Sequence, residues 1–261
     1  MGTGAIVGSI DVAQVTLYVF WIFFAALLWY IRKEDRREGY PLEHDVTRQY
    51  DKDPWLFLAS PKKFVLPHGA GTVEVPNLDD RDTRPIAAER TADFAGASLK
   101  PTGNPMLSGV GPGAWAERAD KPDLAADGKA LIAPMSVATE FSIAEGDPDP
   151  RGLPVMDMNE EIAGTVSDVW VDRAEQMIRY FQVDVAGGGT ALLPHNFCRL
   201  GTLGRSRGKV LHVKAIMASH FADVPGTAAP DQITLLEEEK IMAYYGAGTL
   251  YATPERQEPL L

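Results

Sequence analysis

An uninterrupted apolar run near the N-terminus constrains this chain more than any other feature of its sequence. The twenty residues from Val12 to Ile31 carry no charge, and only Gln14 and Thr16 among them are clearly polar. A helix rises about 1.5 Å per residue, so a helix of this length spans the roughly 30 Å hydrocarbon core of a bilayer. We therefore predict one transmembrane helix over residues 12–31.

The residues on either side of the run favour an uncleaved anchor over a signal peptide. A signal peptide needs a basic segment before the apolar run and a small-residue cleavage site after it. The first ten residues contain no Lys or Arg, and the run ends in Trp29-Tyr30-Ile31-Arg32-Lys33. Because positive residues stay on the cytoplasmic side, we expect residues 1–11 in the periplasm and residues 32–261 in the cytoplasm.

Three side chains at the basic end of the run are expected at the level of the cytoplasmic lipid headgroups. They are Tyr30, Arg32 and Lys33. Two interpretations remain open: the side chains contact an anionic lipid, or they extend to the interface with no specific lipid partner.

The charge balance and the cysteine count exclude several classes of protein. The chain has 25 Lys and Arg against 36 Asp and Glu, a net charge of -11, which disfavours a general nucleic-acid-binding surface. Cys198 is the single cysteine, so the chain forms no internal disulfide, and no Cys/His cluster suggests structural zinc.

The part after the apolar run divides into an extended segment and a mainly β domain. Residues 101–113 hold seven Gly or Pro, which excludes a helix interior, yet apolar islands such as Phe64-Val65-Leu66 occur throughout. We predict that residues 32–110 form an extended, ordered segment lying on partner subunits. The alternative is a partly disordered linker.

Residues 111–261 are predicted to form a small antiparallel barrel with a C-terminal helix. Runs rich in Val, Ile and aromatic residues, separated by turn signals, indicate four or five short strands. The strands are expected at Thr165–Asp172, Met177–Val185, Thr190–Pro194 and Lys209–Ala218. The helix is expected from Asp231 as N-cap to Tyr245, with Gly246 as its stop.

No catalytic constellation is visible in the sequence. The glycine-rich segment Gly109–Gly113 lacks the preceding strand of a dinucleotide fingerprint, and the five histidines have no ligand-like spacing. Short clusters of carboxylates are abundant, and most are expected to be a solvated surface. A partly buried cluster can nonetheless hold and pass protons near neutral pH. Glu160 and Glu161 directly precede a predicted strand, so we expect them in a fixed, partly buried position.

Several collinear segments resemble the H subunit of the purple-bacterial photosynthetic reaction centre. They include Arg37–Glu43, Phe64–Gly69, Pro101–Met106, Gly109–Pro112, Gly152–Val155, Val169–Asp172, Ile233–Glu238 and Leu250–Pro254. The resemblance extends over essentially the whole chain. It implies a PRC-barrel that caps the quinone side of the L and M subunits in the intracytoplasmic photosynthetic membrane. It also implies a non-enzymatic subunit that stabilises the complex.

The resemblance implies cofactors and neighbours as well. Bacteriochlorophyll, bacteriopheophytin, quinones, non-haem iron and carotenoid are expected on L and M, and none on this chain. Membrane lipids, a cytochrome subunit and a light-harvesting antenna are further expected neighbours, and nucleic acid is not.

The resemblance finally implies a role in proton delivery to the secondary quinone. The glutamate of the family's Glu-x-Ala-Gly segment falls on Glu161, and its acidic partner is either Asp157 or Glu160. Proton-uptake groups fall on Asp120 and Asp123, with Arg118 nearby. Some members carry a zinc-binding pair of surface histidines, whereas here Asp127–Ala130 contains none.

Without the resemblance, the alternative functions are a membrane-tethered PRC-barrel adaptor for a soluble partner and, after it, a tethered enzyme.

Overall fold

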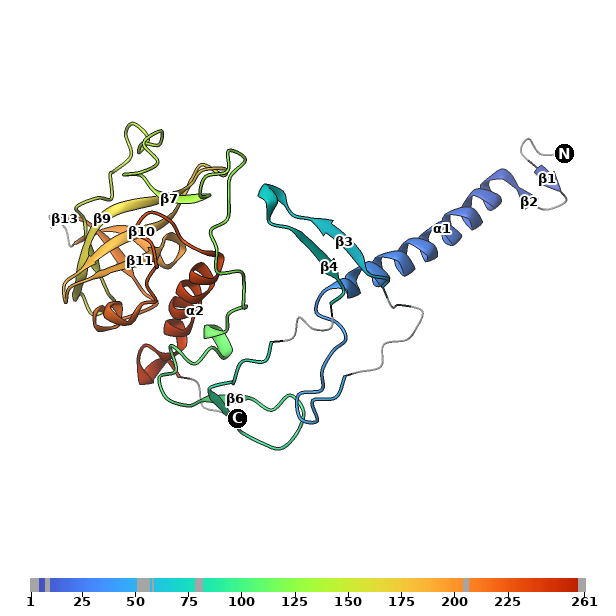
Figure 1. Cartoon of the computed structure of the whole chain (residues 1–261), viewed down its shortest axis with the longest axis horizontal. Coiled ribbons are helices and arrows are strands. Elements are labelled where there is room, and N and C mark those ends of the chain that lie inside the picture. The colour runs from blue at the N-terminus through green and yellow to red at the C-terminus, as the bar shows by residue number, and fades with distance from the viewer. Residues whose placement is uncertain are drawn as a thin grey trace. The chain divides into compact units, whose positions relative to one another are not determined.

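The computed structural model describes residues 5–7, 10–50, 57, 59–77, 82–203 and 207–257. The chain divides into two compact units (Figure 1). The first comprises residues 1–83 with 93–96, and the second comprises residues 84–92 with 97–261. The first unit contains the apolar helix, and the second contains the main sheet and the C-terminal helix.

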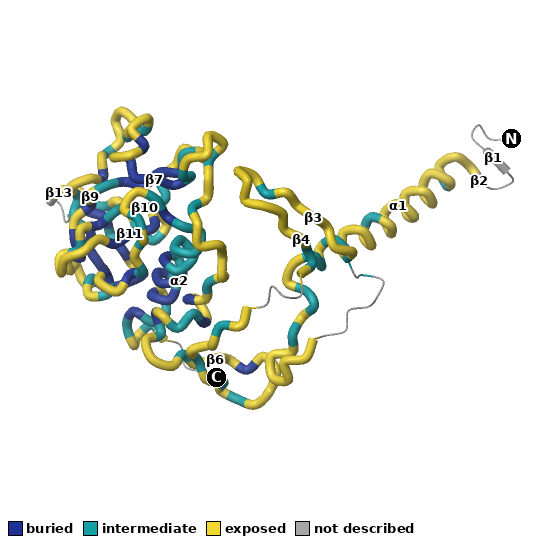
Figure 2. The backbone as a smooth tube through the Cα atoms, in the orientation of Figure 1, coloured by how far each residue is buried: buried dark blue, intermediate teal, exposed yellow. Residues whose placement is uncertain are grey.

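The apolar run forms helix α1, Val12–Glu34, which includes the whole predicted span and continues three residues beyond it. Asp11 caps its start by accepting a hydrogen bond from the Gln14 backbone N–H at 2.8 Å. None of its residues is buried (Figure 2). With the turn that follows, α1 is the one helix in the described part of the chain long and apolar enough to cross a membrane. An apolar helix exposed along its full length requires apolar surroundings.

The charged end of α1 is tied to a hairpin of the first unit. Strands β3, Lys62–Val65, and β4, Thr72–Val75, pair antiparallel. The Glu34 carboxylate accepts hydrogen bonds from Arg37 Nε at 2.9 Å and from Lys62 Nζ at 2.6 Å. A short pair, β1 (Ala5–Val7) and β2 (Ile10–Asp11), precedes the helix.

The second unit is built on a seven-stranded sheet. Its path runs β11-β10-β9-β8-β13-β12, and β7 pairs with β9. All neighbours are antiparallel except β8 and β13, which are parallel. The strands are β7 Ile132–Pro134, β8 Pro154–Met156, β9 Ile162–Asp172, β10 Met177–Val185, β11 Thr190–Pro194, β12 Cys198–Leu203 and β13 Arg207–Val213. A small separate pair, β5 (Ala88–Arg90) and β6 (Leu99–Pro101), belongs to the same unit.

The mainly β prediction is confirmed, and its details are corrected at several places. β10 and β11 have the predicted bounds, whereas β9 begins earlier, at Ile162, and β13 ends earlier, at Val213. The prediction of four or five strands did not include β7, β8 and β12. β7 and β8 have only three residues each and include a proline, and β12 is interrupted by Gly201, so none shows a clear alternation.

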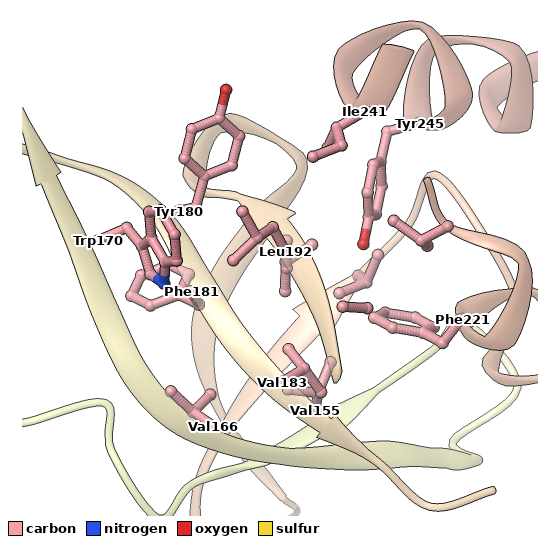
Figure 3. Close-up of a cluster of buried hydrophobic side chains, with 14 of the residues drawn as sticks. Val155, Val166, Trp170, Tyr180, Phe181, Val183, Leu192, Phe221, Ile241 and Tyr245 are labelled. Atoms are coloured by element: carbon pink, nitrogen blue, oxygen red, sulfur yellow. The ribbon is translucent and has the colours of Figure 1, made fainter. Parts of the chain in front are cut away.

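The core lies between the sheet and helix α2, Leu235–Tyr251 (Figure 3). Val155, Val183 and Leu193 of the sheet are fully buried, as are Ile241 and Tyr245 of α2. The Tyr245 ring stacks on Phe197, with ring centroids 5.6 Å apart. Burying each large side chain of this kind stabilises the fold by about 1.5–3 kcal/mol. The predicted C-terminal helix is therefore a layer of the core.

The predicted ends of this helix are wrong, and the structure shows why. Thr234, not Asp231, is the N-cap: it accepts from the Glu237 N–H at 3.1 Å, while the Glu237 carboxylate accepts from the Thr234 N–H at 2.8 Å. This reciprocal capping box satisfies two N–H groups that the first turn leaves without partners. The helix also continues through Gly246 to Tyr251.

Gly246 serves close packing instead of ending the helix. A Cβ at Gly246 would lie 2.5 Å from the Pro112 carbonyl oxygen, and one at Gly248 would lie 2.6 Å from the Ala215 carbonyl oxygen. On the other side of this contact, a Cβ at Gly113 would lie 2.9 Å from the Ala247 Cβ. The glycine-rich segment Gly109–Gly113 is thus a backbone surface against which α2 packs.

Replacing Gly246 with alanine tests this contact, because helix propensity and close packing predict changes of opposite sign in stability. Helix propensity alone predicts that Gly246→Ala stabilises the chain by about 1 kcal/mol. The close approach to Pro112 predicts a loss of about 1–3 kcal/mol instead. Urea denaturation of the full-length chain in detergent measures the difference. Gly226→Ala is the control, because a Cβ there meets no atom within 4 Å; a stabilised Gly246→Ala variant would contradict the packing role.

Candidate functional site

The turn between β8 and β9 is organised by one buried carboxylate, Asp157, which is 2% exposed. Its Oδ1 accepts hydrogen bonds from the backbone N–H groups of Asn159, at 2.8 Å, and Glu161, at 3.1 Å. Its Oδ2 accepts from the Ala218 N–H at 2.8 Å. Three backbone donors therefore hold this carboxylate and join the turn to the segment after β13.

The two glutamates of the turn lie on its outside. Glu160 has a positive φ of 64°, and both Glu160 and Glu161 are exposed, so the expected partly buried position for them is wrong in this chain. Residues 158–162 of this region are exposed, whereas Asp157 is buried. Met158 and Ile162 beside them are 57% and 49% exposed. The turn thus presents an exposed carboxylate, Glu161, together with two exposed apolar side chains.

The packing of two strands explains why a glycine ends the segment Glu161-Ile162-Ala163-Gly164. A Cβ at Gly164 would lie 2.2 Å from the Asp184 carbonyl oxygen on β10. Only glycine allows β9 and β10 to approach this closely at the start of β9. The glycine therefore permits the close pairing of β9 with β10 three residues after Glu161.

The predicted uptake residues lie at the other end of the second unit, near the start of α2. Asp120 Oδ1 accepts a hydrogen bond from the hydroxyl of the N-cap Thr234 at 2.8 Å. Arg118 pairs with Glu239 at 3.7 Å, and Asp123 accepts from the Leu124 N–H at 2.9 Å. All three predicted side chains are exposed.

Two residues of this region were not foreseen as site residues. The Tyr180 hydroxyl on β10 donates a hydrogen bond to Glu238 Oε2 at 3.0 Å. Burial raises the pKa of Glu238 above its ordinary value of 4.5, and nearby Asp123 adds to the rise; the Tyr180 hydrogen bond, Arg179 and Arg118 oppose it. Burial also raises the pKa of the Tyr180 hydroxyl. The spacing in the sequence could have indicated the burial of Glu238, because it shares a helix face with Ile241 and Tyr245, both fully buried.

The two groups of acids are separated by the length of α2. Thr234 places Asp120 at its N-terminal end. At the opposite end, Arg256 donates to the Gly248 carbonyl at 2.8 Å and contacts Met158 Sδ at 2.9 Å, which places the Asp157–Glu161 turn there. The 17 residues of α2 span about 25 Å. The chain alone does not bring Glu161 and the uptake residues together.

The three predicted headgroup residues do not share one face of α1. Lys33 Nζ lies over the Trp29 ring, 5.4 Å from its centroid, and Arg32 lies 3.8 Å from Asp35. Tyr30 is 51% exposed. At 100° per residue, Tyr30 and Lys33 are about 60° apart round the helix, while Arg32 is roughly 160° from Tyr30. Tyr30 and Lys33 therefore lie near one face of the helix and Arg32 on another.

Comparison with known protein families decides the identity of the chain. Residues 4–137, just over half of the sequence, match the model of the photosynthetic reaction centre, H-chain N-terminal region. The chain belongs to this H-chain family. Residues 143–215 match the PRC-barrel domain, which contains β8 to β13. The resemblance noted in the sequence is thereby confirmed.

Membership of the family establishes several properties of this H chain. It is a non-catalytic subunit of a photosynthetic reaction-centre complex, and the family is membrane-associated. This assignment favours the complex over the adaptor and tethered-enzyme alternatives. Among the described residues, no group of three or more His, Cys, Asp or Glu side chains could hold a metal ion.

Asp127, the first residue of the histidine-free stretch Asp127–Ala130, forms an ion pair with an arginine. Arg173 Nη2 donates to Asp127 Oδ2 at 2.8 Å, and its Nε donates to Glu140 at 3.0 Å. The hydrogen bond from Arg173 lowers the pKa of Asp127 to about 2. Asp127 therefore stays ionised at neutral pH and joins its loop to Arg173, the residue that follows β9.

Asp157→Asn tests whether Asp157 is a structural anchor of the H-chain turn. The asparagine amide retains the size but replaces one acceptor oxygen with a donor that faces a backbone N–H. We expect a loss of about 1–3 kcal/mol in the free energy of unfolding. Urea denaturation of the full-length chain measures it. The exposed Asp147→Asn is the control, expected to change stability by less than about 0.5 kcal/mol; equal effects of the two would refute the anchor role.

Glu238→Gln tests the buried carboxyl through the pH dependence of stability. Because the folded-state pKa is raised, the proton on Glu238 stabilises the fold fully below pH 4.5, and this contribution is lost as the pH rises through the folded-state pKa. Glutamine does not titrate. The wild type should therefore lose stability relative to Glu238→Gln as the pH rises above 4.5, measured as the difference in Tm. The exposed Glu145→Gln should show no such trend, and a pH-independent difference for Glu238→Gln would exclude the raised pKa.

Proposed function

We propose that this H chain covers the quinone side of the L and M subunits, stabilises the complex and helps deliver protons from the cytoplasm to the secondary quinone. The observation that carries the proposal is the β8–β9 turn. Asp157 holds the backbone N–H of Glu161 there, and the same turn exposes the apolar side chains of Met158 and Ile162.

Exposed apolar side chains around a carboxylate suit a surface that a partner covers. Met158 and Ile162 gain by leaving water, whereas Glu161 alone would not. A carboxylate taken out of bulk water in this way binds a proton more readily, which is what a proton-transfer group requires.

The chemistry of the quinone requires such groups. Complete reduction of a quinone to a quinol takes two electrons and two protons, and an unneutralised dianion in a low-dielectric site would be very costly. Protons must therefore reach the buried quinone through titratable groups. In this proposal Glu161 is the last group of the H chain on that route, and Asp157 or Glu160 is its acidic neighbour. Asp157 holds Glu161 in place, which supports the first choice.

Asp120, Asp123 and Arg118 form the outer part of the proposed route. They are exposed at the start of α2, beside the half-buried Glu238. Since they lie at the opposite end of α2, a helix about 25 Å long, from the turn that holds Glu161, water and side chains of L and M must complete the path. The acidic excess of the chain supports proton collection on this side.

The placement in the membrane completes the proposal. Residues 1–11 lie in the periplasm, 12–31 cross the membrane, 32–110 lie along partner subunits and 111–261 form the cytoplasmic domain. Tyr30, Arg32 and Lys33 lie at the level of the cytoplasmic lipid headgroups, where Tyr30 and Lys33, near one face of α1, contact an anionic lipid. The L and M subunits hold the bacteriochlorophyll, bacteriopheophytin, quinones, non-haem iron and carotenoid, and a cytochrome subunit and an antenna are further neighbours.

Glu161→Gln in the purified complex tests the proton-transfer role. Glutamine has the size of glutamate but carries no transferable proton at neutral pH. We expect transfer of the second electron to the secondary quinone to slow by about tenfold or more, because that step waits for a proton. Primary charge separation should be unchanged. Flash absorption spectroscopy measures both steps.

Glu175→Gln is the matched control for this experiment. Glu175 is also exposed, but it lies at the other end of β9. Its replacement should leave the second-electron rate unaltered. An unaltered rate in Glu161→Gln, or equal slowing in both variants, would refute the assignment of Glu161.

A further inference from the structure

Positive charge is gathered in one part of this acidic chain. The 38 residues from Val185 to Ala222 contain no Asp or Glu, although the whole chain has a net charge of -11. The same segment holds five Lys or Arg residues and three histidines. It forms β11, β12, β13 and their connections.

The fold brings part of this charge to one face of the β12–β13 hairpin. Arg199 on β12 and His212 on β13 are directly opposite each other in the antiparallel register, so their side chains lie on the same face. Lys214 is two residues beyond His212, just after the end of β13. Gly201 leaves room for the His212 ring, because a Cβ there would lie 2.6 Å from the ring Cδ2.

These three side chains line a pocket of about 430 Å³ together with Arg256. Arg256 reaches it from the segment after α2. Its guanidinium is fixed by hydrogen bonds to the carbonyls of Ala215, at 2.7 Å, and Lys214, at 2.9 Å. No carboxylate is among the lining residues, and Met158 and Phe197 form apolar parts of the wall.

The basic side chains of the pocket lack an acidic partner among the described residues. Within the part of the chain that the structure describes, Arg199, His212 and Lys214 have no ion pair and no side-chain hydrogen bond, and Arg256 bonds neutral carbonyls and a thioether. Like charges gathered in one concave site repel one another and attract an anion. Arginine and lysine together with a tetrahedral oxyanion form strong charge-assisted hydrogen bonds.

We propose that this pocket, formed by Arg199, His212, Lys214 and Arg256, binds a phosphate group, either the headgroup of an anionic phospholipid or inorganic phosphate. The volume suits a phosphate with part of a headgroup, and the apolar wall suits the start of a lipid's glycerol and acyl chains. All four side chains belong to the second unit, and the proposal does not depend on the proton-transfer role of Glu161.

Binding measurements on the purified complex test the proposal. The probes are inorganic phosphate, followed by calorimetry, and phosphatidylglycerol in mixed micelles, compared with zwitterionic phosphatidylcholine. About 0.15 M salt screens diffuse attraction. The exposed Lys214→Gln and Arg199→Gln should each weaken binding by about tenfold or more.

Lys209→Gln is the matched control, because Lys209 is exposed on the same strand but does not line the pocket. It should change the affinity by less than about twofold. Binding of phosphate with this pattern of variants identifies a site for the free anion. Binding of phosphatidylglycerol alone, with the same pattern, identifies a headgroup site. Equal weakening by Lys209→Gln, which indicates diffuse attraction, or no binding of either probe, would overturn the proposal.

Discussion

The close packing of α2 is the contact on which the second unit depends. Gly246 and Gly248 bring the helix backbone against Pro112 and Ala215, and Gly113 completes the contact. This approach lets Ile241 and Tyr245 reach the core from above the sheet. It also places one end of α2 beside Asp120 and the other beside Met158. The candidate uptake group and the candidate transfer group are thus held apart by one rigid element.

Carboxylates in this chain have different roles because their surroundings differ. Asp157 is buried and bonded to three backbone N–H groups, so it is an anchor. Asp127 is held ionised by Arg173. Glu238 is desolvated and binds its proton more tightly than an exposed glutamate. Glu161 is exposed and available to a partner. Residue type alone does not distinguish these cases, since solvation and the nearest donor decide which protonation state is favoured.

Local patterns predicted the regular elements well. The span of α1 follows from an uncharged run, and the bounds of β10 and β11 follow from runs of β-branched and aromatic residues between turn signals. The short strands β7 and β8 were missed, because pairing with β9 and β13 holds them in place and their own residues show no period. The end of α2 was misjudged at Gly246, because a glycine that allows close packing looks in sequence like a glycine that ends a helix.

The sequence by itself determined that one apolar segment must leave water and that a mainly β domain follows it. These two conclusions depend on composition and spacing, which act locally, whereas the resemblance to the H subunit singled out Glu161 and its neighbours as the candidate acids. Only the tertiary structure decided that Asp157 is buried while Glu161 is exposed, that Tyr180 meets Glu238, and that four basic side chains share one pocket. The physical reason is that burial and electrostatic environment arise from residues far apart in the chain, which no local pattern records.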